Sequence, residues 1–272
     1  MTGLVLVRGA GDLATGTILK LYESGFSILA IECARPSAIR RAAAFCEAVY
    51  DGATTVEGVT CRRLAAPDPD AITQCWERRE IPLLVDETLE CCKILQPAAV
   101  VDAILAKKNL GTRRDMAPIT VGLGPGFTAG ADVDAVIETM RGHNLGRVLY
   151  HGSALPNTGV PGAIAGETTR RVIHAPADGA IVHLTQIGDL VEQGQSLAML
   201  GDTPVPATLT GVLRGLIREG YPVTKGLKIA DIDPRKEQKR NCFTVSDKAR
   251  CIAGGVLEAL LHLSRERAVR LL

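Results

Sequence analysis

The second half of this 272-residue chain contains an internal repeat with a period of 32 residues. Residues 179–200 align without a gap on residues 211–232. Three glycines of the first copy fall on three of the second, namely Gly179, Gly188 and Gly194 on Gly211, Gly220 and Gly226. Both copies consist of short apolar runs separated by glycine turns. This pattern predicts two quasi-equivalent halves of a small β barrel or sandwich.

The repeat resembles biotinyl and lipoyl carrier domains, whose two halves share this layout. Those domains carry a modified lysine on the hairpin between the halves. Here the corresponding hairpin is residues 201–207, GDTPVPA, which contains no lysine. We therefore expect a structural or docking role for this module, and not that of a swinging arm.

The first half opens with an apolar strand, a glycine turn, a helical pattern and a second apolar strand. Residues 4–7 form a continuous apolar run, as in a strand buried on both faces. The next segment, GAGDLA, matches the pattern G-x-G-x-x-G/A. In that pattern Gly9 permits a tight turn, Gly11 lets the backbone approach a phosphate, and Ala14 keeps the helix close to the strand. The arrangement predicts a nucleotide-binding turn, and its alternative is a structural turn without a ligand.

Two acidic residues flank this turn. Glu32 ends the second apolar run and lies about 20 residues beyond the glycines, where an acid grips a ribose hydroxyl in dinucleotide-binding proteins. Asp12 directly follows Gly11 and places a carboxylate close to the expected phosphates. It could instead cap the helix or hold a metal or polar ligand group. The sequence therefore predicts a nucleotide cradle without indicating hydride chemistry.

A second glycine loop follows the predicted strand at residues 119–123. The loop contains Gly124, Gly126, Phe127 and Gly130. We predict a helix over residues 131–140, because a glycine loop that leads into a helix N-terminus is a favourable arrangement for binding anions. The alternative is a tight structural turn.

Composition excludes several classes of function. The net charge of +1 and the aromatic content of 3% disfavour nucleic acids and anionic membranes as partners. The sequence shows neither a signal peptide nor an apolar run of about 18 residues, so we predict a cytoplasmic protein without a membrane partner. The eight cysteines include no CxxC spacing, and we predict no metal site. The adjacent pair Cys91 and Cys92 merits a thiol assay.

The predicted fold is of the α/β class. It comprises a Rossmann-like open sheet in a cofactor-binding domain (1–165), a small β barrel-sandwich module (166–235), and a linker with a C-terminal helix (236–272). Ser246 is a suitable cap for that helix, which should run to about Arg267. Its apolar stripe comprises Ile252, Val256, Leu260 and Leu263. The stripe either packs on a domain or forms a contact between copies, which leaves a homo-oligomer as an alternative.

Several segments, among them RGAGDLATG, VGLGPGFTAG, PNTGVPG and SDKAR, resemble the selenium-dependent molybdenum hydroxylase accessory family, also called the YqeB family. The resemblance covers nearly the whole chain and is most specific over residues 122–162. It implies a maturation role for a molybdenum hydroxylase partner of the xanthine dehydrogenase type. It also implies a molybdenum cofactor of the molybdopterin type as the ligand.

Two other functions stay open at this stage. A nicotinamide-dependent oxidoreductase would bind an NAD-like dinucleotide and would need a proton donor, for which Lys107, His143 and His151 are the candidates. A non-catalytic nucleotide-sensing scaffold would need none. No catalytic residue is assigned. If sulfur or selenium is transferred, a cysteine thiolate is the natural carrier, but the sequence does not rank the eight cysteines.

Overall fold

The computed structural model describes residues 3–272. The chain divides into two compact units. The larger unit consists of the residues up to Pro36, Ala44–Asn157 and Val245–Leu272, and the smaller unit of Ser37–Ala43 and Thr158–Thr244. Each unit is therefore assembled from segments that are far apart in the sequence.

The larger unit is built on one nine-stranded mixed sheet with the order β10-β9-β7-β6-β1-β2-β5-β4-β3. Its strands are β1 (Val5–Arg8), β2 (Ile28–Glu32), β3 (Ala53–Val56), β4 (Val59–Arg63), β5 (Ile81–Val85), β6 (Ala99–Asp102), β7 (Ile119–Leu123), β9 (Ala135–Ile137) and β10 (Val148–Leu149). The strands from β9 to β4 run parallel, whereas β10 and β3 pair antiparallel at the two edges. A separate two-stranded sheet joins β8 (Thr128–Ala129) to β11 (Gly152–Ser153).

The register of the central strands brings the predicted site segments to one edge of this sheet. Arg8, the last residue of β1, pairs with Ile31 of β2 and with Asp102 of β6. Asp102 in turn pairs with Gly122 of β7. The first glycine turn, Glu32 and the second glycine loop therefore all follow the carboxyl ends of neighbouring parallel strands.

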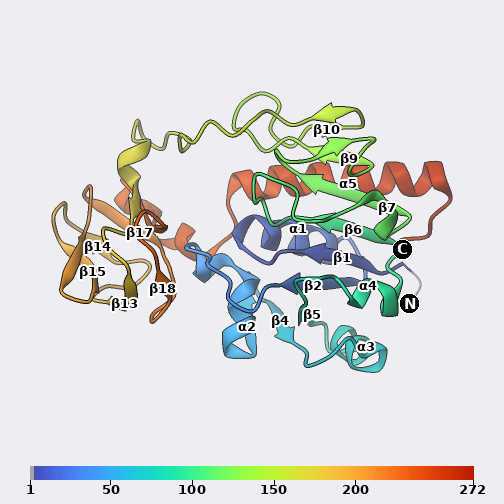
Figure 1. The fold of residues 1–272 in the computed structure, drawn as a ribbon, viewed down its shortest axis with the longest axis horizontal. Coiled ribbons are helices and arrows are strands. Elements are labelled where there is room, and N and C mark those ends of the chain that lie inside the picture. Colours follow the sequence, from blue (N-terminus) through green and yellow to red (C-terminus); the bar gives the residue numbers. More distant parts are fainter. Residues whose placement is uncertain (1–2) are drawn as a thin grey trace. The chain divides into compact units, whose positions relative to one another are not determined.

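The larger unit also contains the longest helices. Its helices are α1 (Asp12–Glu23), α2 (Ala48–Asp51), α3 (Pro69–Glu77), α4 (Cys91–Leu95) and α5 (Asp247–Arg267), with 3-10 turns at Phe45–Glu47 and Arg114–Met116. The predicted C-terminal helix is confirmed as α5: the Ser246 side chain accepts a hydrogen bond from Ala249 N at 3.2 Å, and the apolar stripe is buried. Helix α5 packs along α1 (Figure 1). Among residues 3–272, no helix is long and apolar enough to span a bilayer.

The predicted fold class, a Rossmann-like sheet followed by a barrel-sandwich module and a helix, is wrong. A doubly wound fold needs helices in its crossovers, but residues 131–140, predicted as a helix, contain strand β9. The stretch from Ala135 to Ile137 is apolar and buried throughout, and such a short apolar run suits an internal strand as well as a helix. The larger unit is instead built on a large mixed sheet. Helix α5 is part of this unit and does not form a separate C-terminal region.

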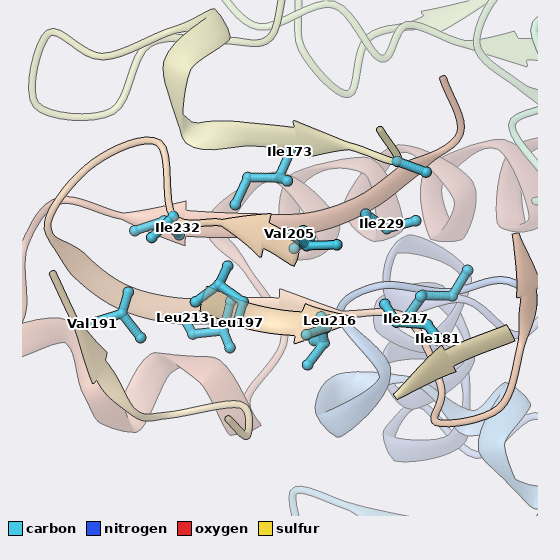
Figure 2. Close-up of a cluster of buried hydrophobic side chains, with 14 of the residues drawn as sticks. Ile173, Ile181, Val191, Leu197, Val205, Leu213, Leu216, Ile217, Ile229 and Ile232 are labelled. Atoms are coloured by element: carbon cyan, nitrogen blue, oxygen red, sulfur yellow. The ribbon is translucent and has the colours of Figure 1, made fainter. Parts of the chain in front are cut away.

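The smaller unit contains two four-stranded sheets, with the orders β12-β19-β17-β14 and β16-β15-β13-β18. The strands are β12 (Val172–His174), β13 (Gly179–His183), β14 (Leu190–Val191), β15 (Ser196–Leu200), β16 (Thr203–Pro206), β17 (Gly211–Leu216), β18 (Pro222–Val223) and β19 (Lys228–Asp233), with 3-10 turns at Arg41–Ala43, Thr169–Arg171 and Lys236–Phe243. Figure 2 shows the apolar side chains that form the core of this unit.

The 32-residue repeat is present in the strand positions, but it does not define the predicted module. Strands β13, β14 and β15 start 32 residues before β17, β18 and β19, respectively. The middle strands are exchanged, since β14 pairs with β17 and β18 pairs with β13. The unit also includes residues 37–43, where Ile39 O accepts a hydrogen bond from Leu216 N at 2.7 Å. The spacing of the repeat predicts where the strands begin, but it does not predict which strands pair with each other.

Candidate functional site

The two glycines of the first turn have different surroundings. Gly9 has φ +100°, and a Cβ atom added there would lie 3.1 Å from the Ala103 carbonyl and from Ile104 Cα. Gly11 has φ −64°, and a Cβ atom added there would meet nothing within 4 Å. The loop after β6 therefore packs directly against Gly9, whereas the space beside Gly11 at the start of α1 is open.

Glu32 lies beside this turn, as predicted, and it holds the turn in place. Its Oε2 atom accepts a hydrogen bond from Ala10 N and its Oε1 atom from Cys33 N, each at 2.8 Å. Each carboxylate oxygen has a second lone pair, so Glu32 is still able to accept a ligand hydroxyl. The structure thus brings Gly9, Gly11, Asp12 and Glu32 together at one edge of the sheet.

A buried segment behind the turn makes it rigid. Ala10 O accepts hydrogen bonds from Cys46 N at 2.8 Å and from the Thr15 hydroxyl at 3.1 Å. The same hydroxyl oxygen accepts a hydrogen bond from Phe45 N at 2.9 Å. These contacts fix the backbone before α1, and the sequence patterns gave no sign of them because residues 45 and 46 lie more than 30 positions from the turn.

In the second loop the predicted site glycines face other parts of the chain. Gly124 has φ +80°, and an added Cβ atom would lie 2.6 Å from the Thr139 hydroxyl oxygen. Gly126 has φ +110°, and an added Cβ atom would lie 2.6 Å from Lys108 Cα. Both positions therefore require glycine for close packing of the protein on itself.

The rest of this loop is packed on the chain at Phe127 but not at Gly130, where an added Cβ atom would meet nothing within 4 Å. The buried Phe127 ring covers Gly122, where an added Cβ atom would lie 2.6 Å from the ring. Gly130 N donates a hydrogen bond to Val133 O at 2.8 Å. Strand β9 follows in place of a helix, so the helix N-terminus on which the anion-site interpretation depended is not present after this loop.

Lys248, at the start of α5, also lies near the first glycine turn, although no sequence motif pointed to it. Gly16 of α1 packs on Ala249 of α5, where an added Cβ atom would lie 2.7 Å from the Ala249 Cβ atom. Gly16 is in the second turn of α1 and Ala249 in the first turn of α5, so the amino-terminal ends of the two helices lie side by side. Lys248 is in this first turn of α5 and is half-buried.

Burial lowers the pKa of Lys248 below the 10.5 usual for lysine, and the charge of Arg141 lowers it further. The carboxylates of Asp12, Glu138 and Asp247 oppose this shift. The amine therefore lies within the electrostatic reach of Asp12 in the first turn of α1. Lys248 forms no ion pair within 4.0 Å among residues 3–272.

This position is electrostatically unfavourable for a lysine. Helix N-termini carry partial positive charge, so acids are favoured there and cations are disfavoured. A bound anion would interact favourably with the positive end of the helix dipole and with the half-buried ammonium group. In the sequence, Lys248 could have been noticed as a lysine two residues after the cap Ser246. Its nearness to the first turn of α1 could not, because that depends on the packing of two helices more than 200 residues apart.

A buried network lies beside the first turn. Arg8 forms an ion pair with Asp102 at 3.3 Å and donates hydrogen bonds to the Thr112 hydroxyl at 2.9 Å, to Leu110 O at 3.0 Å and to Glu87 O at 3.2 Å. The Thr112 hydroxyl donates to Asp102 at 2.6 Å. Because Arg8 pairs with Asp102 and both of its terminal nitrogens bond to these partners, it holds the loop after β6 against the turn.

The structure adds little to the catalytic candidates. Lys107, His143 and His151, considered as proton donors, are all exposed. Within residues 3–272, no group of three or more histidine, cysteine, aspartate or glutamate side chains is arranged to hold a metal ion. The first glycine turn, the N-termini of α1 and α5, and Lys248 lie close together at the carboxyl edge of the α/β sheet.

Comparison with known proteins gives one close relative. No protein-family model matches the chain. The uncharacterized protein YqeB of Escherichia coli K12 is 54% identical over 263 residues, which cover 97% of this chain and 48% of that protein. The chain therefore spans about half the length of this curated relative. Its name supports the family label that the sequence motifs suggested, and it specifies no activity.

The solved structures that resemble the chain do so weakly. They include the ectoine utilization protein EutE (DoeB) from Ruegeria pomeroyi, with 10% identity, a TM-score of 0.25 and 85% coverage of both chains. An aspartoacylase family protein from Mesorhizobium loti has 13% identity, a TM-score of 0.26, and 86% and 85% coverage. A succinylglutamate desuccinylase from Silicibacter has 14% identity, a TM-score of 0.25, and 85% and 84% coverage. Similarity at this level supports no conclusion about fold or activity.

Proposed function

We propose that this chain is an accessory protein for a selenium-dependent molybdenum hydroxylase of the xanthine dehydrogenase type. It binds a molybdenum cofactor, or a related nucleotide-type ligand, through the ligand's phosphates at the first glycine turn. The sequence motifs and the relative with 54% identity support the family part of this proposal. The site geometry supports the phosphate-binding part.

The observation that carries the proposal is the position of Lys248. Its half-buried amine lies in the first turn of α5, next to the first turn of α1. A phosphate there would meet the positive ends of two helix dipoles as well as the ammonium group. Because the space in front of Gly11 is open, the phosphate oxygens are able to approach the backbone N–H groups that begin α1.

The neighbouring side chains fit such a ligand. Glu32 is fixed by Ala10 N and Cys33 N and retains lone pairs for a hydroxyl of a ribose. Asp12, which would repel a phosphate, acts on Lys248 and is partly compensated by it. The bound cofactor would supply the molybdenum chemistry of the partner enzyme. This chain would bind the phosphates and orient the rest of the ligand.

Native mass spectrometry of anaerobically purified protein tests the identity of the ligand. The wild-type chain and Lys248→Met are incubated with a molybdopterin-type cofactor and, separately, with NAD. We expect the wild type to retain a pterin adduct that NAD does not displace, and Lys248→Met to lose it. Lys20→Met is the matched control, because Lys20 is an exposed lysine near the other end of α1.

Two results would contradict the proposal. Equal retention of the pterin by Lys248→Met and the wild type would place the site elsewhere. Binding of NAD alone would favour a nicotinamide-dependent oxidoreductase, and a screen of hydride acceptors would follow.

A further inference from the structure

A small pocket lies at the carboxyl-terminal ends of helices α1 and α3, where strands β2 and β5 begin. It has a volume of about 200 Å³, which is less than the roughly 300–1,000 Å³ of pockets that enclose drug-sized ligands. Its lining residues are Tyr22, Gly25, Phe26, Ser27, Ile28, Trp76 and Ile81. The pocket therefore suits a small chemical group, and it lies at the opposite end of α1 from the first glycine turn.

Aromatic side chains are unusually frequent in this lining. The chain has one tryptophan, four tyrosines and four phenylalanines, and the pocket includes the tryptophan and one of each of the other two types. The Trp76 Nε1–H group donates a hydrogen bond to Ile28 O at 2.8 Å, and the Tyr22 hydroxyl donates one to Arg79 O at 3.1 Å. Because both polar groups are bonded to the backbone, the two side chains present mainly ring carbons to a ligand.

The surroundings of the pocket favour a positive charge inside it. No lining side chain is charged. Helix C-termini carry partial negative charge, and those of α1 and α3 both adjoin the pocket. The charged residues within three positions of a lining residue are Lys20, Glu23, Glu77, Arg78, Arg79 and Glu80. They are three bases and three acids and none lines the pocket, so they give it no net charge of their own.

We propose that this pocket binds the methylated ammonium group of a small molecule, such as the head of a quaternary amine. The methyl groups would contact the ring carbons, and the positive charge would interact favourably with the aromatic rings and with the two helix C-termini. A primary ammonium would lose hydrogen bonds to water, because the lining side chains offer only the hydroxyls of Ser27 and Tyr22 as acceptors. None of these residues belongs to the proposed phosphate site, so the failure of one proposal leaves the other untouched.

Fluorescence of Trp76 tests the proposal directly, because Trp76 is the only tryptophan of the chain and lines the pocket. The full chain is titrated with choline and with its neutral carbon analogue, in which a tert-butyl group replaces the trimethylammonium group. Potassium chloride controls for ionic strength. We expect a saturable change with choline and at least about fivefold weaker binding of the neutral analogue. Equal binding of the two, or no saturable change with choline, would overturn the proposal.

The Tyr22→Leu variant tests the role of the aromatic ring. Leucine keeps this wall apolar but removes the π-system, so choline should bind about three- to tenfold more weakly while the neutral analogue binds as it does to the wild type. Tyr50→Leu is the matched control and should bind choline normally, because Tyr50 is a half-buried tyrosine of the same unit whose hydroxyl likewise donates to a backbone carbonyl, Pro36 O, at 2.8 Å. An equal loss for both ligands in Tyr22→Leu would mean that the ring only shapes the pocket, and would contradict recognition of a cation. Tighter binding of a trimethyllysine peptide than of choline would contradict a small-molecule ligand and assign the pocket to a modified protein.

Discussion

The two glycine loops of the larger unit look alike in sequence but differ in structure. Both follow a buried parallel strand and both contain closely spaced glycines. At Gly11 an added Cβ atom would enter open space, whereas at Gly126 it would meet the backbone of Lys108. The first loop leads into a helix and the second into a strand. A glycine pattern therefore indicates that another group packs closely against the backbone. The surrounding structure is needed to tell whether that group is another part of the chain or could be a ligand.

The largest expected effect comes from a side chain at Gly126. Gly126→Ala should destabilise the protein by about 3 kcal/mol, because φ +110° is strained for alanine and the Cβ atom would lie 2.6 Å from Lys108 Cα. Gly11→Ala should lower stability by no more than about 1 kcal/mol, through its weaker helix cap. Urea unfolding of both variants measures the difference. Equal losses would mean that the two loops do not differ as described.

The next largest effect concerns Lys248. Lys248→Met should weaken phosphate-ligand binding by about 1.5–3 kcal/mol, the contribution of a charge-assisted hydrogen bond. The folded state lowers the pKa of this lysine, so its protonated side chain opposes folding, and the unfolded state binds more protons between that lowered pKa and 10.5. Calorimetry should accordingly show a higher unfolding temperature for the variant. Weaker binding together with lower stability would indicate a structural role.

A smaller effect is expected at Glu32. Glu32→Ala leaves Ala10 N and Cys33 N without their acceptor and loosens the turn, so stability should fall by about 1–2 kcal/mol. Binding of a ribose-bearing ligand should weaken more than binding of inorganic phosphate. Competition measurements with the two ligands would show this difference, and an equal loss for both would remove Glu32 as a hydroxyl acceptor.

The smallest effect is a pH dependence of binding. Lys248 attracts an anion only when protonated, and burial lowers its pKa from the usual 10.5. Affinity should therefore decline as the pH rises through that lowered pKa, and the midpoint should lie below 10.5 in the unliganded protein. The Lys248→Met variant should lack this decline. A wild-type profile that is flat up to pH 10.5 would argue against ligand contact with the amine.

The sequence predicted those features that depend on neighbouring residues. The strand before Gly9, the helix after it and the cap at Ser246 follow local periodicity and capping, and all are present. The predicted helix at residues 131–140 was wrong because a short apolar run does not distinguish a helix from an internal strand.

Features that depend on distant contacts could not be predicted in this way. The packing of Gly16 on Ala249 places Lys248 near Asp12, and the hydrogen bond from Cys46 to Ala10 fixes the turn. Likewise, the exchange of β14 and β18 between the two copies of the repeat is a matter of strand pairing. Each of these contacts joins segments whose proximity no periodicity or spacing encodes.

The measurement that tests the central claim most directly is the affinity of the wild type, Gly11→Ala and Gly11→Val for a molybdopterin-type ligand, followed by pterin fluorescence. The two variants share the loss of the glycine cap but differ in the bulk that they place in the open space. We predict a graded loss of affinity that exceeds tenfold, about 1.4 kcal/mol, for Gly11→Val, with no more than about 1 kcal/mol lost in stability. Wild-type affinity in Gly11→Val would show that the ligand does not bind at this turn.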